Sequence, residues 1–152
     1  KNMNYKRIFE EKFVYDFGIE DCLNAFMWSH MKMPNCTQSD KSDQNIIFYI
    51  KKSLPHIVES IFGSTINITE QANITESGFV SVSTGSLPGS EFKSVMNFEN
   101  VNNQSRLSIT VDIAWNEGIS EFVKEAIKSF VITEIKEWRK SLPSHLADMK
   151  KN

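Results

Sequence analysis

The chain has 152 residues, of which 40% are hydrophobic and 24% are charged, and its formal net charge is −2. This length is typical of one domain with a well-buried core. The near-neutral charge excludes a global basic field for nucleic acid, and no apolar run approaches the roughly 20 residues that span a membrane. Two cysteines, Cys22 and Cys36, are too few for a disulfide framework.

The first third of the chain predicts a strand, a helix, a loop and a second strand. Residues 5–17 predict a strand whose aromatic side chains share one face, at Phe9, Phe13, Tyr15 and Phe17. Residues 18–33 predict a helix with an inward face made of Ile19, Cys22, Leu23, Phe26 and Met27. Residues 33–45 are polar and predict a loop, and residues 46–52 predict a strand buried on both faces.

The next segment, LPHIVESIFG at residues 54–63, has two interpretations. It fits a short core helix, with Pro55 in its first turn and Gly63 as its C-terminal cap. It also fits a mobile lid, because each apolar side chain inserted into a membrane gains about 1.5–3 kcal/mol and each neighbouring lysine about 1 kcal/mol. The residues alone favour the core helix.

The middle of the chain predicts consecutive strands at residues 64–72, 78–84, 91–99 and 105–115. The last of these has the clearest pattern, an alternation with mostly polar neighbours of Leu107, Ile109, Val111, Ile113 and Trp115. Residues 74–78 and 86–91 are rich in turn formers. The pattern indicates an antiparallel meander.

Residues 118–142 predict a long helix, with apolar residues at i, i+3 and i+4 for about six turns. Asn116 or Gly118 is expected to start the helix and Pro143 to end it. One long helix across a curved antiparallel sheet is an α+β architecture. We therefore expect a single domain over residues 1–145 and a tail over residues 146–152. Periodicity does not distinguish a packed core from a cavity between helix and sheet.

The sequence lacks recognisable catalytic and metal-binding motifs. His30, His56 and His145 do not have the spacing of metal ligands. The chain contains no GxSxG, P-loop, GxGxxG or CxxC motif. Each histidine is interpreted as exposed or structural, and no enzyme activity, metal or cofactor is expected. These features favour a binding domain.

Four stretches, taken in order, resemble the PRELI/slowmo family. They are RIFEEKFVYDFGIEDCLNAFMW, MKMPN, IKKSLPHIVESIFG and WNEGISEFVKEAIKSFVITEIKEW. They are similar to that family's N-terminal strand and helix, its proline-asparagine segment, its Leu-Pro loop and its C-terminal helix. The segment between Pro34 and Leu54 is shorter than in the family, so a strand or hairpin is expected to be missing there.

The resemblance implies a START-like helix-grip fold, in which a sheet wrapped on the long helix encloses one phospholipid. It implies binding of phosphatidic acid or phosphatidylserine and transfer between membranes, with transient contact at a membrane surface. The implied location is the mitochondrial intermembrane space, or otherwise the cytoplasm. The implied protein partner is a small helical protein with twin CX9C motifs, and no nucleic-acid partner is expected.

The resemblance also assigns site residues by position. The lipid head group is expected near Lys51, Lys52, His30 and Lys128. His30 stands where the family has Arg or Lys, and it is charged only when protonated. The lid and membrane contact comprise Leu54, Ile57, Val58, Ile61 and Phe62, so the resemblance favours the lid over the core helix. The cavity lining is expected to include Phe26, Leu107, Ile109, Val111, Phe122, Ile127 and Phe130.

Three alternatives to phospholipid transfer remain open. A sterol-binding START-like module of the VASt type is favoured by a small pocket with weak basic lining, because a sterol needs one polar partner rather than several cations. A protein-interaction domain with a filled core would use residues 54–63 to dock a partner. An enzyme of the START-like superfamily needs a convergent polar cluster, which the sequence does not reveal.

Overall fold

The structure is a computed structural model that describes residues 4–39, 42–87 and 89–152. Its elements in chain order are β1 (Tyr5–Tyr15), α1 (Ile19–Lys32), β2 (Cys36–Ser39), β3 (Asn45–Ser53), α2 (His56–Phe62), β4 (Thr65–Ile74), β5 (Gly78–Leu87), β6 (Ser90–Val101), β7 (Gln104–Trp115) and α3 (Glu121–Lys151). The described strands form a seven-stranded antiparallel sheet in the order β1-β7-β6-β5-β4-β3-β2. Consecutive pairing from β2 to β7 confirms the predicted meander.

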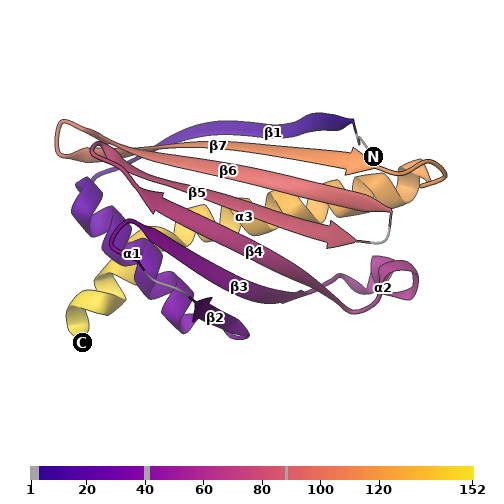
Figure 1. The fold of residues 1–152 in the computed structure, drawn as a ribbon, viewed down its shortest axis with the longest axis horizontal. Helices are drawn as coiled ribbons and strands as arrows, with labels where there is room; N and C mark the ends of the chain where they lie inside the picture. Colours follow the sequence, from indigo (N-terminus) through magenta and orange to yellow (C-terminus); the bar gives the residue numbers. More distant parts are fainter. Residues whose placement is uncertain (1–3, 40–41, 88) are drawn as a thin grey trace.

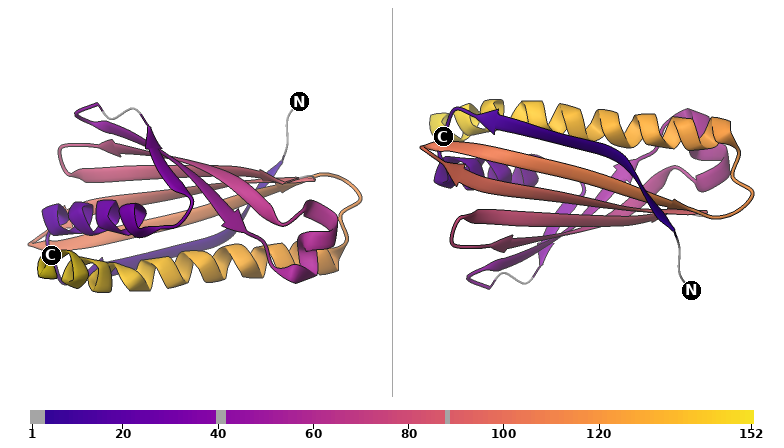
Figure 2. Two further views of the ribbon diagram at one scale, coloured as in Figure 1. Left: turned by 90° about the horizontal axis from the view of Figure 1, so that it is seen from below. Right: turned by 90° about the horizontal axis from the view of Figure 1, so that it is seen from above.

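The sheet curves around α3, which runs along one of its faces (Figures 1 and 2). Helix α1 lies beside the C-terminal half of α3, where Trp28 Nε1 donates a hydrogen bond to Asp148 Oδ2 at 2.9 Å. Helix α2 lies at the opposite end, near the start of α3. None of the described helices has the length and apolar character needed to cross a membrane.

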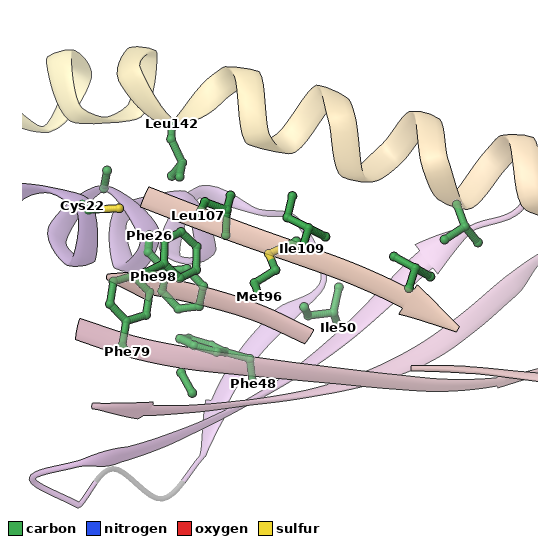
Figure 3. Close-up of a cluster of buried hydrophobic side chains, with 14 of the residues drawn as sticks. Cys22, Phe26, Phe48, Ile50, Phe79, Met96, Phe98, Leu107, Ile109 and Leu142 are labelled. Atoms are coloured by element: carbon green, nitrogen blue, oxygen red, sulfur yellow. The ribbon is translucent and has the colours of Figure 1, made fainter. Parts of the chain in front are cut away.

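The end of the sheet nearest α1 is filled by aromatic side chains (Figure 3). The ring of Phe26 on α1 lies 5.1 Å from Phe79 on β5 and 5.9 Å from Phe98 on β6, measured between ring centroids. Phe79 and Phe98 stack at 4.2 Å, and all three side chains are at most 1% exposed. Edge-to-face and stacked contacts add to the stabilisation from burying these rings. This end of the molecule is therefore a packed core.

Helix α3 begins later and ends later than the sequence pattern suggested. Its N-cap is Ser120, whose Oγ accepts a hydrogen bond from the backbone N–H of Val123 at 3.2 Å, rather than Asn116 or Gly118. The expectation that Pro143 ends the helix was wrong, because the helix continues to Lys151 with Leu146 buried. Residues 146–151 are therefore part of α3 and not a separate tail.

A side chain from β1 compensates for the proline inside α3. Pro143 has no N–H, so the carbonyl of Arg139, four residues earlier, loses its helical donor. The hydroxyl of Tyr15 donates to that same carbonyl at 2.7 Å, and Tyr15 is 2% exposed. The helix passes through Pro143 because a tertiary hydrogen bond satisfies the group that the proline leaves free.

This arrangement predicts a coupling between Tyr15 and Pro143. We expect Tyr15→Phe to lower the free energy of unfolding by about 1–3 kcal/mol, because the buried Arg139 carbonyl loses its donor. The loss should be smaller in a Pro143→Ala background, where the N–H of the new alanine can donate to that carbonyl. Urea unfolding of the two single variants and the double variant measures the coupling. Strictly additive effects would contradict the proposed compensation.

The segment before β3 contains a strand that the sequence interpretation missed. Residues Cys36–Ser39 form β2 and pair with β3, so the prediction of a loop over 33–45 and of a missing strand was wrong. This strand has only four residues, mostly polar, and lies at the edge of the sheet. A strand of this kind does not show the alternation of apolar and polar residues by which strands are recognised in a sequence. The prediction that residues 46–52 are buried on both faces was also wrong, because Phe48 is 1% exposed but Tyr49 is 47% exposed.

Candidate functional site

A cavity of about 130 Å³ lies between the sheet, α2 and α3. Its wall is mostly apolar, with contributions from Ile50 on β3, Val58 on α2, Met96 on β6, and Ile127 and Phe130 on α3. A concave apolar space with a few polar groups is the usual form of a small-molecule site. The cavity is therefore the candidate functional site.

The hollow arises from a change in side-chain size along neighbouring strands. The inward positions of β5 pass from Phe79 at the packed end to Ser83 and Gly85, and those of β6 pass from Phe98 to Ser94. Gly85 is required by close packing, since a Cβ there would lie 2.2 Å from the ring of Phe92, which faces it across the strands. Phenylalanines thus fill the α1 end, whereas the smaller side chains of Ser83 and Ser94 leave space beyond it, and the ring of Phe92 occupies the place beside Gly85.

A buried His–Glu pair forms the inner polar part of the cavity wall. His30 is on the last turn of α1 and Glu70 is on β4, and the two residues are 3% and 6% exposed. His30 Nε2 lies 2.6 Å from Glu70 Oε1, and His30 Nδ1 donates to the Phe26 carbonyl at 2.8 Å. Ser81 Oγ donates to the other carboxylate oxygen of Glu70. The ring of His30 also stacks on Phe48 at 4.2 Å.

The geometry and electrostatics favour a protonated His30 beside an ionised Glu70. The carbonyl of Phe26 only accepts, so Nδ1 carries a proton, and a second proton on Nε2 completes the hydrogen bond to the carboxylate. Burial lowers the pKa of His30, but the hydrogen bond and negative charge of Glu70 outweigh it, so the pKa is raised above its usual value. The positive charge of His30 and the negative charge of Glu70 are thereby in direct contact.

A second ion pair lies where the cavity wall meets solvent. Lys52 Nζ on β3 is 3.0 Å from Glu134 Oε1 on α3, and the two side chains are 35% and 43% exposed. Among the described lining residues, the groups that carry charge are Lys52, Glu134, His30 and Glu70. With His30 protonated, these two positive and two negative groups balance.

Two of the four residues expected at a lipid head group line the cavity. Lys52 and His30 are in its wall. Lys51 is exposed on the other face of β3, because neighbouring strand residues point to opposite faces. Lys128 lies outside the cavity and pairs with Glu125 at 3.0 Å. The structure does not bring these four residues together.

The segment expected to be a lid forms one side of the cavity. Leu54 and Val58 line it and are 9% and 1% exposed. Helix α2 ends at the cap residue Gly63, whose φ of 87° favours glycine and whose N–H donates to the Glu59 carbonyl at 2.8 Å, as the core-helix interpretation expected. The side chains of Ile57, Ile61 and Phe62 lie outside the described part of the structure. Movement of this segment stays a prediction.

Of the seven residues expected to line the cavity, two are in its wall and five lie elsewhere. Ile127 and Phe130 line the cavity. Four others belong to the packed core and are 0% exposed, namely Phe26, Leu107, Ile109 and Val111. Phe122 is 66% exposed, because it lies beside the buried stripe that contains Val123 and Ile127. A strand pattern shows which face is inward but not which part of that face adjoins empty space.

The sequence analysis missed Glu70 as a site residue, and it did not predict that His30 would form a buried ion pair with Glu70. Glu70 occupies an inward position of β4, in the same alternation as Ile66 and Ala72. A carboxylate at an apolar position of an alternating strand is a signal for a buried partner, because unpaired buried charges are strongly unfavourable. The pairing with His30, 40 residues away in sequence, requires the fold.

Comparisons with known proteins identify the fold. No family model matches the chain, and no curated protein matches its sequence. A START superfamily protein from Mycobacterium smegmatis matches with a TM-score of 0.59 and 6% identity, covering 95% of this chain and 99% of that one. The Zhui aromatase/cyclase from Streptomyces sp. R1128 matches with a TM-score of 0.60 and 5% identity, covering 97% and 95%.

A third similar structure, Ara h 8.0201, matches with a TM-score of 0.55 and 8% identity, covering 98% of this chain and all of that one (100%). At these identities the likeness concerns the fold alone. The chain has the helix-grip fold of START and Bet v1-like proteins, in which a curved antiparallel sheet wraps a long C-terminal helix. The predicted fold class is confirmed.

Proposed function

We propose that this protein binds one lipid-like apolar ligand in the cavity between the sheet, α2 and α3. The observation that carries the proposal is the mostly apolar wall with a buried ion pair at its inner end. Burial of apolar surface supplies binding free energy, about 25 cal/mol per Å², and a few fixed polar groups supply orientation. The helix-grip fold of the similar structures supports a ligand site at this place.

The polar cluster supports binding rather than catalysis. Both ring nitrogens of His30 are engaged, Nδ1 by the Phe26 carbonyl and Nε2 by Glu70. A general base needs a nitrogen within reach of the proton that it removes. With both nitrogens occupied, His30 has no lone pair directed at a bound molecule. The pair therefore serves as a fixed polar feature of the wall.

Phospholipid transfer is the second candidate function, and Lys52 in the cavity wall favours it. Pockets for drug-sized ligands hold roughly 300–1,000 Å³, so a two-chain lipid would need α2 to move outward from the cavity of about 130 Å³. In this candidate, α2 is the lid that contacts a membrane. The PRELI/slowmo relationship, the intermembrane-space location and the twin CX9C partner belong to this candidate and rest on the sequence resemblance.

A cavity-filling variant tests ligand binding. Ile68 lines the cavity, whereas its neighbour Thr69 is exposed on the other face of β4. We expect Ile68→Trp to lower the affinity for Nile red, a neutral apolar dye, by at least about tenfold, because the indole occupies the space of the ligand. Thr69→Trp adds the same side chain to the same strand and should leave the affinity unchanged. Fluorescence titration measures both, and native mass spectrometry with organic extraction identifies any lipid that co-purifies.

The two candidate functions predict different results in a liposome assay. Movement of a fluorescent phosphatidic acid between vesicles, abolished by Ile68→Trp and kept in Thr69→Trp, would favour transfer. Nile red binding without phospholipid movement would favour a smaller ligand. Equal dye affinity in the wild type and in Ile68→Trp would show that the cavity is not the binding site.

A further inference from the structure

We propose that Glu70 anchors the hydroxyl group of a neutral lipid-like alcohol at the inner end of the cavity. The inference rests on the proposed binding function and names the ligand class for it. Three features carry it, namely the free acceptor capacity of Glu70, a serine without a partner in the same row of the sheet, and the balance of charge in the wall.

Glu70 has acceptor capacity beyond its contacts within the protein. An ionised carboxylate offers about four acceptor positions on its two oxygens. In the described structure His30 takes one position on Oε1 and Ser81 takes one on Oε2. The residue lines the cavity, so a ligand hydroxyl placed there can donate to it. A hydrogen bond to a charged acceptor is among the stronger kinds in proteins.

A row of hydroxyl groups continues from Glu70 across the sheet. Glu70 pairs with Ser83 on β5, and Ser83 pairs with Ser94 on β6, so these residues lie side by side on the inward face. Both serines line the cavity. Ser94 is 4% exposed, and its Oγ has no hydrogen-bond partner among the described residues. A buried polar atom without a partner calls for an explanation, and a ligand hydroxyl that both donates and accepts supplies one.

The balance of charge in the wall favours a neutral ligand over an anion. The positive charge of His30 is matched by Glu70, and that of Lys52 by Glu134, at 2.6 and 3.0 Å. An anionic head group would meet no unmatched cation and would lie near two carboxylates. A cationic ligand would find Glu70 already neutralised. Because transfer of an unmatched charge out of water is strongly unfavourable, the site favours an uncharged polar group.

Three probes of one chain length test this selection, namely decanol, its methyl ether and decanoate. Each is titrated against the full chain loaded with Nile red, and the displacement gives its affinity. The alcohol has a hydrogen to donate, the ether has none, and decanoate adds a negative charge. We expect decanol to bind at least about tenfold more tightly than the ether and than decanoate, corresponding to one hydrogen bond to a charged group.

Variants then test which residues cause the preference for decanol over its ether. Ser94→Ala should lower the affinities for decanol and its ether together several-fold, because Ser94 donates to an oxygen that both probes carry. Ser108→Ala, on the outer face of β7, should leave both affinities unchanged. The double variant His30→Leu with Glu70→Leu removes the anchor without leaving a buried unmatched charge, and its alcohol-to-ether ratio should fall to about one. A purely structural effect of the double substitution would lower the affinity for all probes alike and leave the ratio unchanged.

The possible outcomes separate this inference from the proposed function. Equal affinities of the wild type for decanol and ether would overturn the anchor while leaving apolar ligand binding intact. Tighter binding of decanoate would overturn the selection of neutral ligands and favour an anionic lipid. Failure of the protein to bind both Nile red and decanol, with decanol titrated alone by calorimetry, would contradict the proposed function itself. If the double variant does not fold, the comparison of the three probes on the wild type still decides the inference.

Discussion

His30→Leu is expected to lower the free energy of unfolding by about 3–5 kcal/mol at neutral pH, the usual effect of removing one partner of a buried ion pair. Leucine fills much of the space of the imidazole but cannot compensate the charge of Glu70, which is 6% exposed in the wild type. The remaining hydrogen bond from Ser81 is too weak to replace an opposite charge at 2.6 Å. Urea denaturation followed by circular dichroism measures the loss.

The double variant His30→Leu with Glu70→Leu is the matched control. It removes both charges, and a buried pair replaced by apolar residues is often neutral or even stabilising. We therefore expect it to regain most of the stability lost in His30→Leu. If the double variant is as unstable as the single one, the ring packing of His30 on Phe26 and Phe48 is the main contribution and the ion pair is not.

The same pair predicts a dependence of stability on pH. Because the folded-state pKa of His30 is raised above 6.5, its contribution is complete below about pH 6.5 and is lost as the pH rises through the folded-state value. The wild type should therefore become less stable, relative to the double variant, between slightly acidic and alkaline pH. A constant difference across that interval would contradict the protonated state of His30.

The fold was predictable because the sequence contains strong, regular patterns over its longest elements. Strand β7 has an alternating pattern made of Leu107, Ile109, Val111 and Ile113, and α3 has an apolar stripe. Each pattern repeats several times, so a single residue that departs from it does not obscure the prediction. The strands with weaker patterns, β4 to β6, could also be placed, because consecutive strands joined by short turns usually pair with each other in an antiparallel sheet. The short, polar β2 lacks any such pattern and was missed.

The behaviour of Pro143 was not predictable from local rules. A proline within a helical pattern normally ends the helix, since it removes a donor and crowds the preceding turn. Here the donor comes from Tyr15, which is 124 residues away in sequence. Burial of Leu142 and Leu146 on both sides of Pro143 further stabilises the continued helix. Tertiary contacts of this kind are invisible in a window of sequence.

The site was predictable only in part, for a related reason. Sequence patterns placed Ile127 and Phe130 on the inward side of α3, and both line the cavity. They could not show where along the sheet the side chains become small enough to leave a hollow. That boundary depends on Ser83 and Ser94, which are ordinary polar strand residues in the sequence. Only the pairing of β5 with β6 shows that they lie side by side.

Phe26→Ala is expected to lower the free energy of unfolding by about 3–5 kcal/mol, as for other buried phenylalanines. Phe26 is 0% exposed and contacts rings from α1, β3, β5, β6 and α3, including Phe79, Phe98 and Trp138. Their positions are fixed by several elements at once, so the surroundings cannot collapse fully into the space left behind. Thermal and urea unfolding measure the loss.

Phe122→Ala is the matched control, because the same substitution is made in a helix at a side chain that is 66% exposed. We expect a change within about 0.5 kcal/mol, as for surface substitutions generally. The contrast between the two variants tests whether Phe26 belongs to a packed core while Phe122 lies on the exposed face of α3. A loss at Phe122 comparable to that at Phe26 would mean that Phe122 packs inward in solution, as its helical position first suggested. The cavity would then be smaller than the described structure shows, and the case for a ligand within it would weaken.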